Sequence, residues 1–183
     1  MFLLSLKENE YDTKVAPFLK NGVLLDTSTF FEFIQGLINT RRNTADTGWK
    51  DEYQKITNLF ERIKLRWDKI FLTPHIMTET CSHFNKLYHT RNHDFTEISK
   101  EFISIINTTS EKTPIKKECT KCYKYGTSLE IGDLSIYAVV DDFAKDKKKI
   151  AIITKDGGFQ TRYATNSYVM IIDHTLIQDL VSG

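Results

Sequence analysis

Short apolar runs alternate along this chain with longer segments in which apolar residues recur at helical spacing. Four such runs are bounded by polar or turn-forming residues: 23–25, 70–72, 150–153 and the centre of 167–173. Runs of this kind are typical of strands that are buried on both faces of a parallel sheet. The helical spacing predicts helices at 29–39, 52–69, 75–88 and 95–106, one that opens near Gly132, and short ones near 159–163 and after 173.

Strands that alternate with helices predict an α/β fold, a three-layer α/β/α sandwich with a central, mainly parallel sheet. A length of 183 residues suits one domain with a sizeable core. We divide the chain into an N-terminal extension at 1–20 and a domain at 21–183, with a polar insertion near 107–128 that we interpret as a loop.

Composition and charge exclude few classes of protein. The chain is 40% hydrophobic and 27% charged, which is typical of a globular protein. Its net charge of +1 does not by itself indicate that it binds nucleic acid. Apolar runs stay far below the roughly 18 residues that span a bilayer, and the start "MFLLSLKENE" lacks the basic region of a signal peptide. Three cysteines, an odd number, fit a reducing compartment. We therefore expect a cytoplasmic protein without a membrane partner.

Four acidic residues stand where predicted strands end or predicted helices begin. Asp26 and Asp156 each follow a strand, Glu79 lies in the first turns of the helix after another strand, and Asp133 opens a helix. Each acid alone is equally well explained as a helix cap. Together they are expected at the carboxyl edge of one sheet, which is where open α/β proteins bind their ligands.

Several carboxylates in one pocket repel one another unless a cation lies among them. Hard oxygen ligands without matching Cys or His favour Mg²⁺ or Mn²⁺ over zinc. Such ions activate water and stabilise the oxygens of an in-line phosphoryl displacement. The pattern therefore predicts hydrolysis of a phosphodiester bond.

The stretches "LLDTS", "LTPHIMTE", "EIGDLSI" and "IITKDGGF" resemble, in this order, the motifs of PIN-domain nucleases, the group that includes VapC-type toxins. The resemblance covers roughly residues 21–174 and implies a PIN-like fold, Mg²⁺ or Mn²⁺ dependence and endonucleolytic cleavage of RNA. It assigns both catalysis and metal binding to four residues: Asp26, Glu79, Asp133 and Asp156. It places Ser28 and Thr154 beside them as hydrogen-bonding support. The extension, the segment 40–70 and the insertion depart from the compact toxins.

Two other functions were weighed against this nuclease. A phosphatase of the haloacid dehalogenase type is excluded, because Ser28 stands where its second Asp is required, and Tyr137 and Ala138 stand where its late Asp is required. A PIN-fold module that binds RNA or a protein partner without cutting stays open as the alternative, although all four acids are present. An antitoxin or other protein partner and a homodimer are likewise left open.

Basic residues cluster at several places that suit a phosphate backbone. The expected nucleic-acid contacts follow the first helix and lie in the insertion: Arg41, Arg42, Lys116, Lys117 and Lys121. Tyr123 and Tyr125 interleave with the lysines of the insertion, and aromatic and basic side chains together favour single-stranded RNA over DNA. The alternative is an ordinary solvated surface, which we favour for the run "KDKKK" at 145–149.

Two further signals are weaker. Cys119 and Cys122 form a single CxxC, which is interpreted as a pair of reduced thiols, since zinc would need two more ligands. His83 lies four residues after Glu79, hence on the same helical face, and is interpreted as a surface histidine rather than a contact to substrate.

Overall fold

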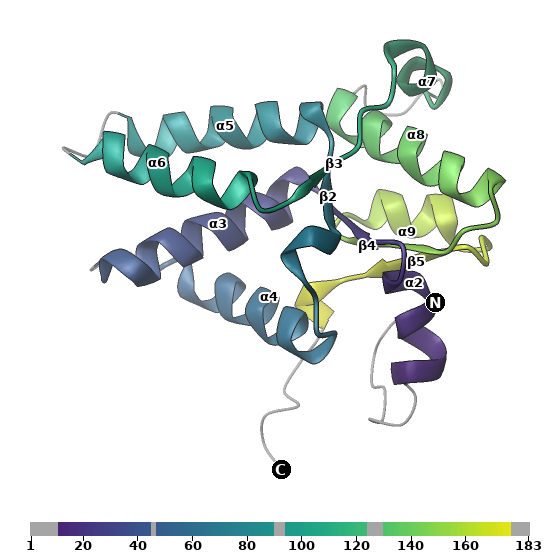
Figure 1. The fold of residues 1–183 in the computed structure, drawn as a ribbon, viewed down its shortest axis with the longest axis horizontal. Coiled ribbons are helices and arrows are strands. Elements are labelled where there is room, and N and C mark those ends of the chain that lie inside the picture. The colour runs from purple at the N-terminus through teal and green to yellow at the C-terminus, as the bar shows by residue number, and fades with distance from the viewer. Residues whose placement is uncertain (1–10, 45–46, 90–93, 124–129, 177–183) are drawn as a thin grey trace.

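The computed structural model describes residues 11–44, 47–89, 94–123 and 130–176, and Figure 1 shows how they are arranged. The strands are β1 (Val23–Leu25), β2 (Ile70–Leu72), β3 (Ser110–Glu111), β4 (Ile150–Ile153) and β5 (Val169–Ile172). The α-helices are α2 (Ala16–Leu19), α3 (Thr27–Arg42), α4 (Lys50–Arg62), α5 (Pro74–Tyr88), α6 (Phe95–Ile106), α7 (Lys116–Lys121), α8 (Ile131–Lys145) and α9 (Gly157–Tyr163). The shorter helical turns are η1 (Tyr11–Val15), η2 (Trp67–Lys69) and η3 (His174–Leu176).

The five strands form one sheet in the order β3-β2-β1-β4-β5, and every neighbouring pair is parallel. The chain runs from β1 outward through β2 to β3, and then returns to β4 on the other side of β1. Crossovers between parallel strands are right-handed, so the helices of the two halves cover opposite faces of the sheet. Figure 1 shows α3 to α6 on one side and α8 and α9 on the other. The predicted α/β fold with a parallel sheet between helical layers is confirmed.

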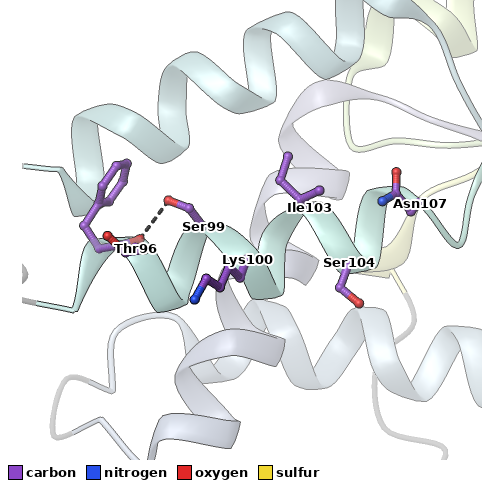
Figure 2. A pocket seen from close by; sticks show the side chains of 7 residues that line it. Thr96, Ser99, Lys100, Ile103, Ser104 and Asn107 are labelled. Atoms are coloured by element: carbon purple, nitrogen blue, oxygen red, sulfur yellow. Dashed lines mark hydrogen bonds between the residues drawn. The ribbon is translucent and has the colours of Figure 1, made fainter.

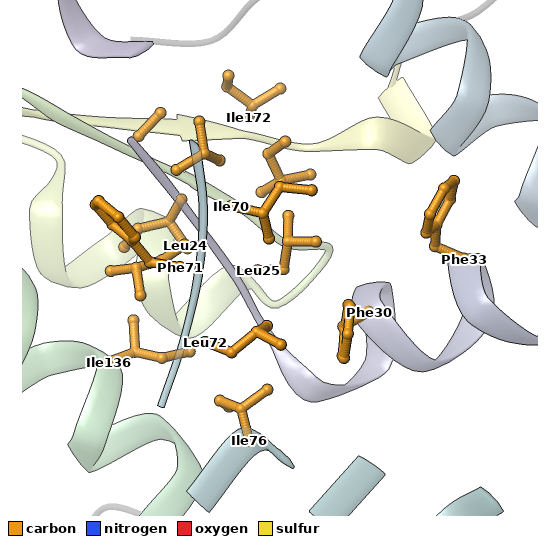
Figure 3. Packing of buried hydrophobic residues seen from close by; sticks show 14 of the residues in the cluster. Leu24, Leu25, Phe30, Phe33, Ile70, Phe71, Leu72, Ile76, Ile136 and Ile172 are labelled. Atoms are coloured by element: carbon orange, nitrogen blue, oxygen red, sulfur yellow. The ribbon is translucent and has the colours of Figure 1, made fainter. Parts of the chain in front are cut away.

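The core lies between the sheet and its helices. Every residue of β1, β2, β4 and β5 is buried, as continuous apolar runs predict for a covered parallel sheet. Figure 3 shows side chains from three helices among those of the strands: Ile76, Ile136, Phe30 and Phe33. Burial of each such side chain contributes about 1.5–3 kcal/mol. The strand ends that carry the acidic residues are therefore anchored in a well-packed core.

The helix predicted at 52–69 ends earlier than its apolar pattern, at Arg62. Lys64 has a φ of 47°, in the left-handed region, and the backbone N–H of Leu65 donates to the carbonyl of Phe60 at 2.9 Å. This geometry is a common way to end a helix, but Gly or Asn usually occupies the left-handed position. Because a lysine occupies it here, the sequence carried no stop signal.

The prediction of a loop over 107–128 is wrong at two places. Ser110 and Glu111 form β3, which pairs with Phe71 and Leu72 of β2, and α7 follows. A strand of two polar residues at the edge of a sheet has no apolar run by which a pattern could detect it. Residues 124–129, and with them Tyr125, lie outside the described residues.

Part of the N-terminal extension joins the core. Val15 is fully buried, and Phe18 and Leu19 of α2 pack against the same cluster. Residues 1–10 lie outside the described residues, and the division from the domain at residue 20 stays a prediction. None of the described helices combines the length and the apolar character that a membrane crossing requires.

Candidate active site

The order of the strands reverses between β1 and its neighbour β4. From β1 the chain continues to β2 on one side, and from β4 it continues to β5 on the other. Ligand sites of open α/β sheets form at the carboxyl ends of such a pair of strands. Asp26 directly follows β1, and Thr154 and Asp156 follow β4, so all three lie at this edge.

Asp26 is buried, with 6% of its surface exposed, and hydrogen-bond donors surround its carboxylate. The backbone N–H of Thr29 donates to Oδ1 at 2.7 Å, which makes Asp26 the N-cap of α3. Ser28 Oγ donates to the same oxygen at 3.2 Å, and the buried hydroxyl of Thr154 donates to Oδ2. Thr154 Oγ1 also accepts the backbone N–H of Asp156 at 2.9 Å. The two strand ends are thus joined through the Asp26 carboxylate.

The Glu79 carboxylate lies between the start of α3 and the start of α8. Thr27 Oγ1 donates to Glu79 Oε2 at 2.6 Å. A Cβ atom at Gly132 would lie 2.6 Å from Oε2 and 2.8 Å from Oε1 of Glu79. Residue 132 therefore has to be a glycine for the Glu79 carboxylate to lie here. A hydrogen bond of 2.6 Å between the hydroxyls of Thr73 and Ser135 also links the starts of α5 and α8.

Asp133 lies in the first turn of α8, whose N-cap is Glu130. Burial is the largest cause that raises the pKa of Asp133 from 3.8 to about 7. The further causes are the negative charges of four other carboxylates: Glu130, Asp156, Asp26 and Glu79. The pKa of Tyr137, one turn further along α8, is raised to about 12 by burial and then by the charge of Asp133. The structure thus brings the other three predicted acids close enough to Asp133 for each to act on its charge.

The four carboxylates form an open arrangement rather than a closed cage. Among the described residues, no three of them offer oxygens within 4.8 Å of one another. Asp156 is exposed, and its Oδ1 accepts the backbone N–H of Gly158 at 2.7 Å, so Asp156 also caps α9. A cap of this kind occupies one carboxylate oxygen. At such a spacing a bound ion would contact some of the four carboxylates directly and the others through water.

The lysines predicted to contact nucleic acid lie on α7, beside the helix that carries Asp133. Lys116, Lys117 and Lys121 are exposed. The opposite side of α7 packs on α8 through Cys119 and Cys122, which contact Leu134 and Ala138. The positive face of α7 is therefore attached to the same helix as the acidic edge.

Arg41 and Arg42 lie at the other end of α3 from Asp26. The helix has 16 residues, so about 22 Å of helix axis separates them from that acid. Arg42 forms ion pairs with Asp94 at 2.6 Å and with Glu101 at 3.7 Å, while Arg41 is exposed. The structure does not bring these two arginines together with the four acids.

Cys119 and Cys122 are free thiols buried against α8. Burial raises the pKa of both thiols, so neither is poised as a thiolate. Among the described residues, neither belongs to a group of three side chains with metal-ligand spacing. This arrangement fits the interpretation as reduced thiols with a packing role.

Two residues at the edge were missed by sequence reasoning. Thr27, which donates a hydrogen bond to Glu79, and Glu130, whose charge acts on Asp133, were not among the predicted site residues. Both could have been found by their position next to predicted acids in the sequence. Thr27 directly follows Asp26, and Glu130 precedes the Gly132-Asp133 pair by two residues. His83 is exposed, and its ring lies 5.5 Å from that of Phe31, which fits a surface histidine.

A shallow hollow runs along one face of α6, and none of the predicted site residues lines it. Figure 2 shows its lining by Thr96, Ser99 and Ile103 of α6 and by Asn107, the C-cap of this helix. Ser99 donates its hydroxyl to the carbonyl of Phe95 within the helix at 2.7 Å. The hollow has no converging charged groups and offers no catalytic chemistry.

Comparison with known proteins assigns no family. No protein-family model and no curated protein matches the chain. Among solved structures, the chain is similar to the PIN domain of RRP44 from T. brucei, with a TM-score of 0.43 and 11% sequence identity. This similarity covers 88% of the chain and 82% of that domain. Such a low TM-score does not establish a shared family, so the function has to be argued from the geometry of the site.

Proposed function

We propose that this protein is a nuclease that depends on a divalent metal ion and cleaves RNA in preference to DNA. Its active site would be the carboxyl edge of the sheet, with Asp26, Glu79, Asp133 and Asp156 as metal ligands. One observation carries the proposal: Asp26, Glu79, Asp133 and Asp156 lie near one another at this edge, close enough for the charges of the other three to help raise the pKa of Asp133. Carboxylates this close together repel one another, and a bound cation would offset that repulsion.

The residues at this edge fit Mg²⁺ or Mn²⁺. All four candidate ligands offer hard carboxylate oxygens, and no Cys or His is among them. The missing side chain of Gly132 leaves room for the Glu79 carboxylate. When bound, a divalent ion supplies activation of water and stabilisation of the oxygens around the scissile phosphate.

The protein's own residues would fix the positions of the ligands. Thr29, Ser28 and Thr154 hold the Asp26 carboxylate from three directions. Thr27 holds Glu79 in the same way. Burial and the neighbouring carboxylates raise the pKa of Asp133 in the metal-free protein, and a bound cation would offset this by favouring the ionised carboxylate. Donors that orient ligands are as much a part of a metal site as the ligands.

Binding of a single-stranded nucleic acid is supported by the exposed lysines of α7, a helix that packs against α8, while the choice of RNA over DNA rests on the resemblance to PIN-domain nucleases. Flexible single strands can follow such a basic face into an acidic site more readily than a stiff duplex. The order of the four acids along the chain agrees with the resemblance to PIN-domain nucleases. A VapC-type toxin role, an antitoxin partner and a homodimer stay predictions.

A cleavage assay tests the proposal. Purified full-length protein is incubated with single-stranded RNA and with DNA of the same sequence, in Mn²⁺ and in EDTA. We expect Mn²⁺-dependent cleavage of RNA that falls at least about 100-fold in Asp133→Asn, which removes one charged ligand without removing a helix cap. Asp142→Asn is the matched control, because Asp142 lies on the same helix and is exposed.

Two results would contradict the proposal. Equal cleavage by Asp133→Asn and Asp142→Asn would show that the acidic edge is not the active site. Binding of RNA by the wild type without any cleavage in Mn²⁺ or Mg²⁺ would favour the non-catalytic PIN-fold module instead.

A further inference from the structure

Glu32 of α3, Glu52 of α4 and His174 of η3 meet inside the molecule, and none of them belongs to the acidic edge. One ring nitrogen of His174 and one carboxylate oxygen from each glutamate all lie within 4.8 Å of one another. His174 is fully buried. Among the described residues, the two ring nitrogens of His174 and the buried Oε2 atoms of Glu32 and Glu52 make no hydrogen bond.

The negative charges of this cluster are not fully compensated by its own atoms. His174 Nε2 lies 3.7 Å from Glu32 Oε2 and 3.5 Å from Glu52 Oε2. A neutral imidazole offers one proton at this nitrogen, which cannot serve two oxygens. Each buried polar atom left without a partner costs about 1–3 kcal/mol, and the two carboxylates repel each other. A positive charge between the three side chains would remove both penalties.

The outer oxygens of the two glutamates are already held by lysines. Lys155 pairs with Glu32 Oε1, and Lys55 Nζ lies 2.7 Å from Glu52 Oε1. Each lysine thereby turns the other oxygen, Oε2, toward His174. Groups that hold the far side of a ligand in this way are typical of built metal sites, where they fix the orientation of the ligating atom.

We propose that Glu32, Glu52 and His174 bind a divalent transition-metal ion, with Zn²⁺ as the best fit. Zinc bonds of about 2.0–2.2 Å at tetrahedral angles place neighbouring ligand atoms about 3.4 Å apart. The two distances from His174 Nε2, 3.7 and 3.5 Å, are close to this value. One imidazole nitrogen in the ligand set favours Zn²⁺ over Mg²⁺, and three protein ligands leave a fourth position for water.

The ion would join three elements that are far apart in the chain. α3 and α4 already pack on each other, and η3 packs on α4. A metal at their meeting point would clamp α4 and the segment after β5 to α3. This site is independent of the proposed nuclease function, because it uses none of the four acids.

Zinc binding is tested in the full-length chain carrying Asp133→Asn, which weakens any competing uptake at the acidic edge. After removal of metal with a chelator, titration calorimetry and elemental analysis should show one equivalent of bound Zn²⁺, and Zn²⁺ should raise the melting temperature. Adding Glu52→Gln should weaken binding at least about 100-fold, beyond the 10–100-fold typical of residues that only support a ligand. Adding Glu61→Gln, the same change at an exposed position of α4, should leave binding unchanged.

A second variant, His174→Gln, distinguishes the loss of a metal ligand from a defect in folding. His174→Gln removes the nitrogen ligand, and its effect is scored only after circular dichroism shows a native helix content. Zinc uptake that is lost in Glu52→Gln or in folded His174→Gln, but kept in Glu61→Gln, supports the site. Equal affinity in Glu52→Gln and Glu61→Gln overturns it. The site is also overturned if the protein takes up no Zn²⁺ and nuclear magnetic resonance shows that the His174 ring is doubly protonated at neutral pH. In that case a proton supplies the positive charge.

Discussion

The acidic edge and the Glu32–Glu52–His174 cluster both bring carboxylates together, but they differ in the hydrogen-bond donors that stabilise the negative charge. At the edge, hydroxyl groups and helix-start amides donate to Asp26, Glu79 and Asp156. In the cluster, the inner oxygens and the imidazole face one another without donors among the described residues. The edge is partly open to water, whereas His174 is fully buried.

This difference separates two reasons for binding a metal. A carboxylate that already has donors and solvent is stable without an ion, so its metal can exchange and take part in chemistry. Buried ligand atoms without partners gain most of their stabilisation from the ion itself. We therefore expect the edge to govern cleavage and the cluster to stabilise the fold. Three variants, one of which carries three substitutions, test the role of the edge and of the basic face of α7 beside it.

After the loss expected for Asp133→Asn, the next largest effect on cleavage belongs to Gly132→Ala. Its new Cβ would approach the Glu79 carboxylate to 2.6 Å. The atoms it meets are the far end of a flexible side chain, so the carboxylate swings aside at little cost in stability but leaves its position in the site. We expect cleavage of RNA to fall at least about 10-fold, while the uptake of Zn²⁺ by the His174 cluster is unchanged.

Gly157→Ala is the matched control for this substitution. A Cβ at Gly157 would meet nothing within 4 Å, so cleavage should be retained. If both variants cleave alike, the position of Glu79 does not matter to the reaction, and the edge loses one of its proposed ligands. A large fall in melting temperature for Gly132→Ala alone would show that the two starts of α5 and α8 cannot adjust.

A smaller effect is expected from the basic face of α7. Changing Lys116, Lys117 and Lys121 together to Ala removes three exposed positive charges. Binding of single-stranded RNA should weaken about 10-fold at low salt, and the slope of log affinity against log salt concentration should fall by about 2, because fewer counterions are released. The measurement is fluorescence anisotropy over a range of salt concentrations with a catalytically inactive chain.

The control for these lysines lies at the opposite edge of the sheet. Lys145, Lys147 and Lys148 precede β4 and are equally exposed. Changing them to Ala alters the net charge by the same amount. If this triple variant lowers the salt slope as much as the α7 variant does, overall charge rather than a defined path to the acidic edge governs binding.

The smallest effect concerns the stability of the metal-free protein. The pKa of Asp133 is 3.8 in the unfolded reference and about 7 in the folded protein. The folded state therefore holds a proton that the unfolded state releases, and wild type loses stability as pH rises from about 4 to about 7. Because Asp133 is only half-buried and solvent screens it, we expect Asp133→Asn to gain about 1–2 kcal/mol at pH 7 in EDTA, or about 2–6 °C in melting temperature.

Melting curves at several pH values check both the size and the sign of this effect. The gain should shrink as pH falls toward 4 and vanish well below 3.8, where wild-type Asp133 is protonated in both states. Addition of Mn²⁺ should stabilise the wild type more than Asp133→Asn by mass action. A variant that melts at or below the wild type in EDTA at every pH would show that repulsion at the acidic edge is not significant.

Much of the fold could be predicted because its signals are local. Apolar runs that end in Asp26 or Thr154 mark buried parallel strands, and helical spacing marks the helices between them. β3 could not be predicted, since Ser110 and Glu111 join the sheet only through backbone pairing with β2. The early end of α4 at Arg62 was also hidden, because Lys64 adopts a left-handed conformation that lysine rarely takes.

The sequence by itself determined the fold class, and it predicted that four acids lie at one edge of the sheet. It could do so because parallel strands present their carboxyl ends on one side, so a residue's place after a strand already fixes its place in the molecule. Only the tertiary structure decided which groups hold those acids, that Arg42 pairs with Asp94 instead of lying at the site, and that Glu32, Glu52 and His174 meet. The physical reason is that these contacts join residues with no regular spacing along the chain. Packing of helices on the sheet, rather than any local pattern, brings them within reach of one another.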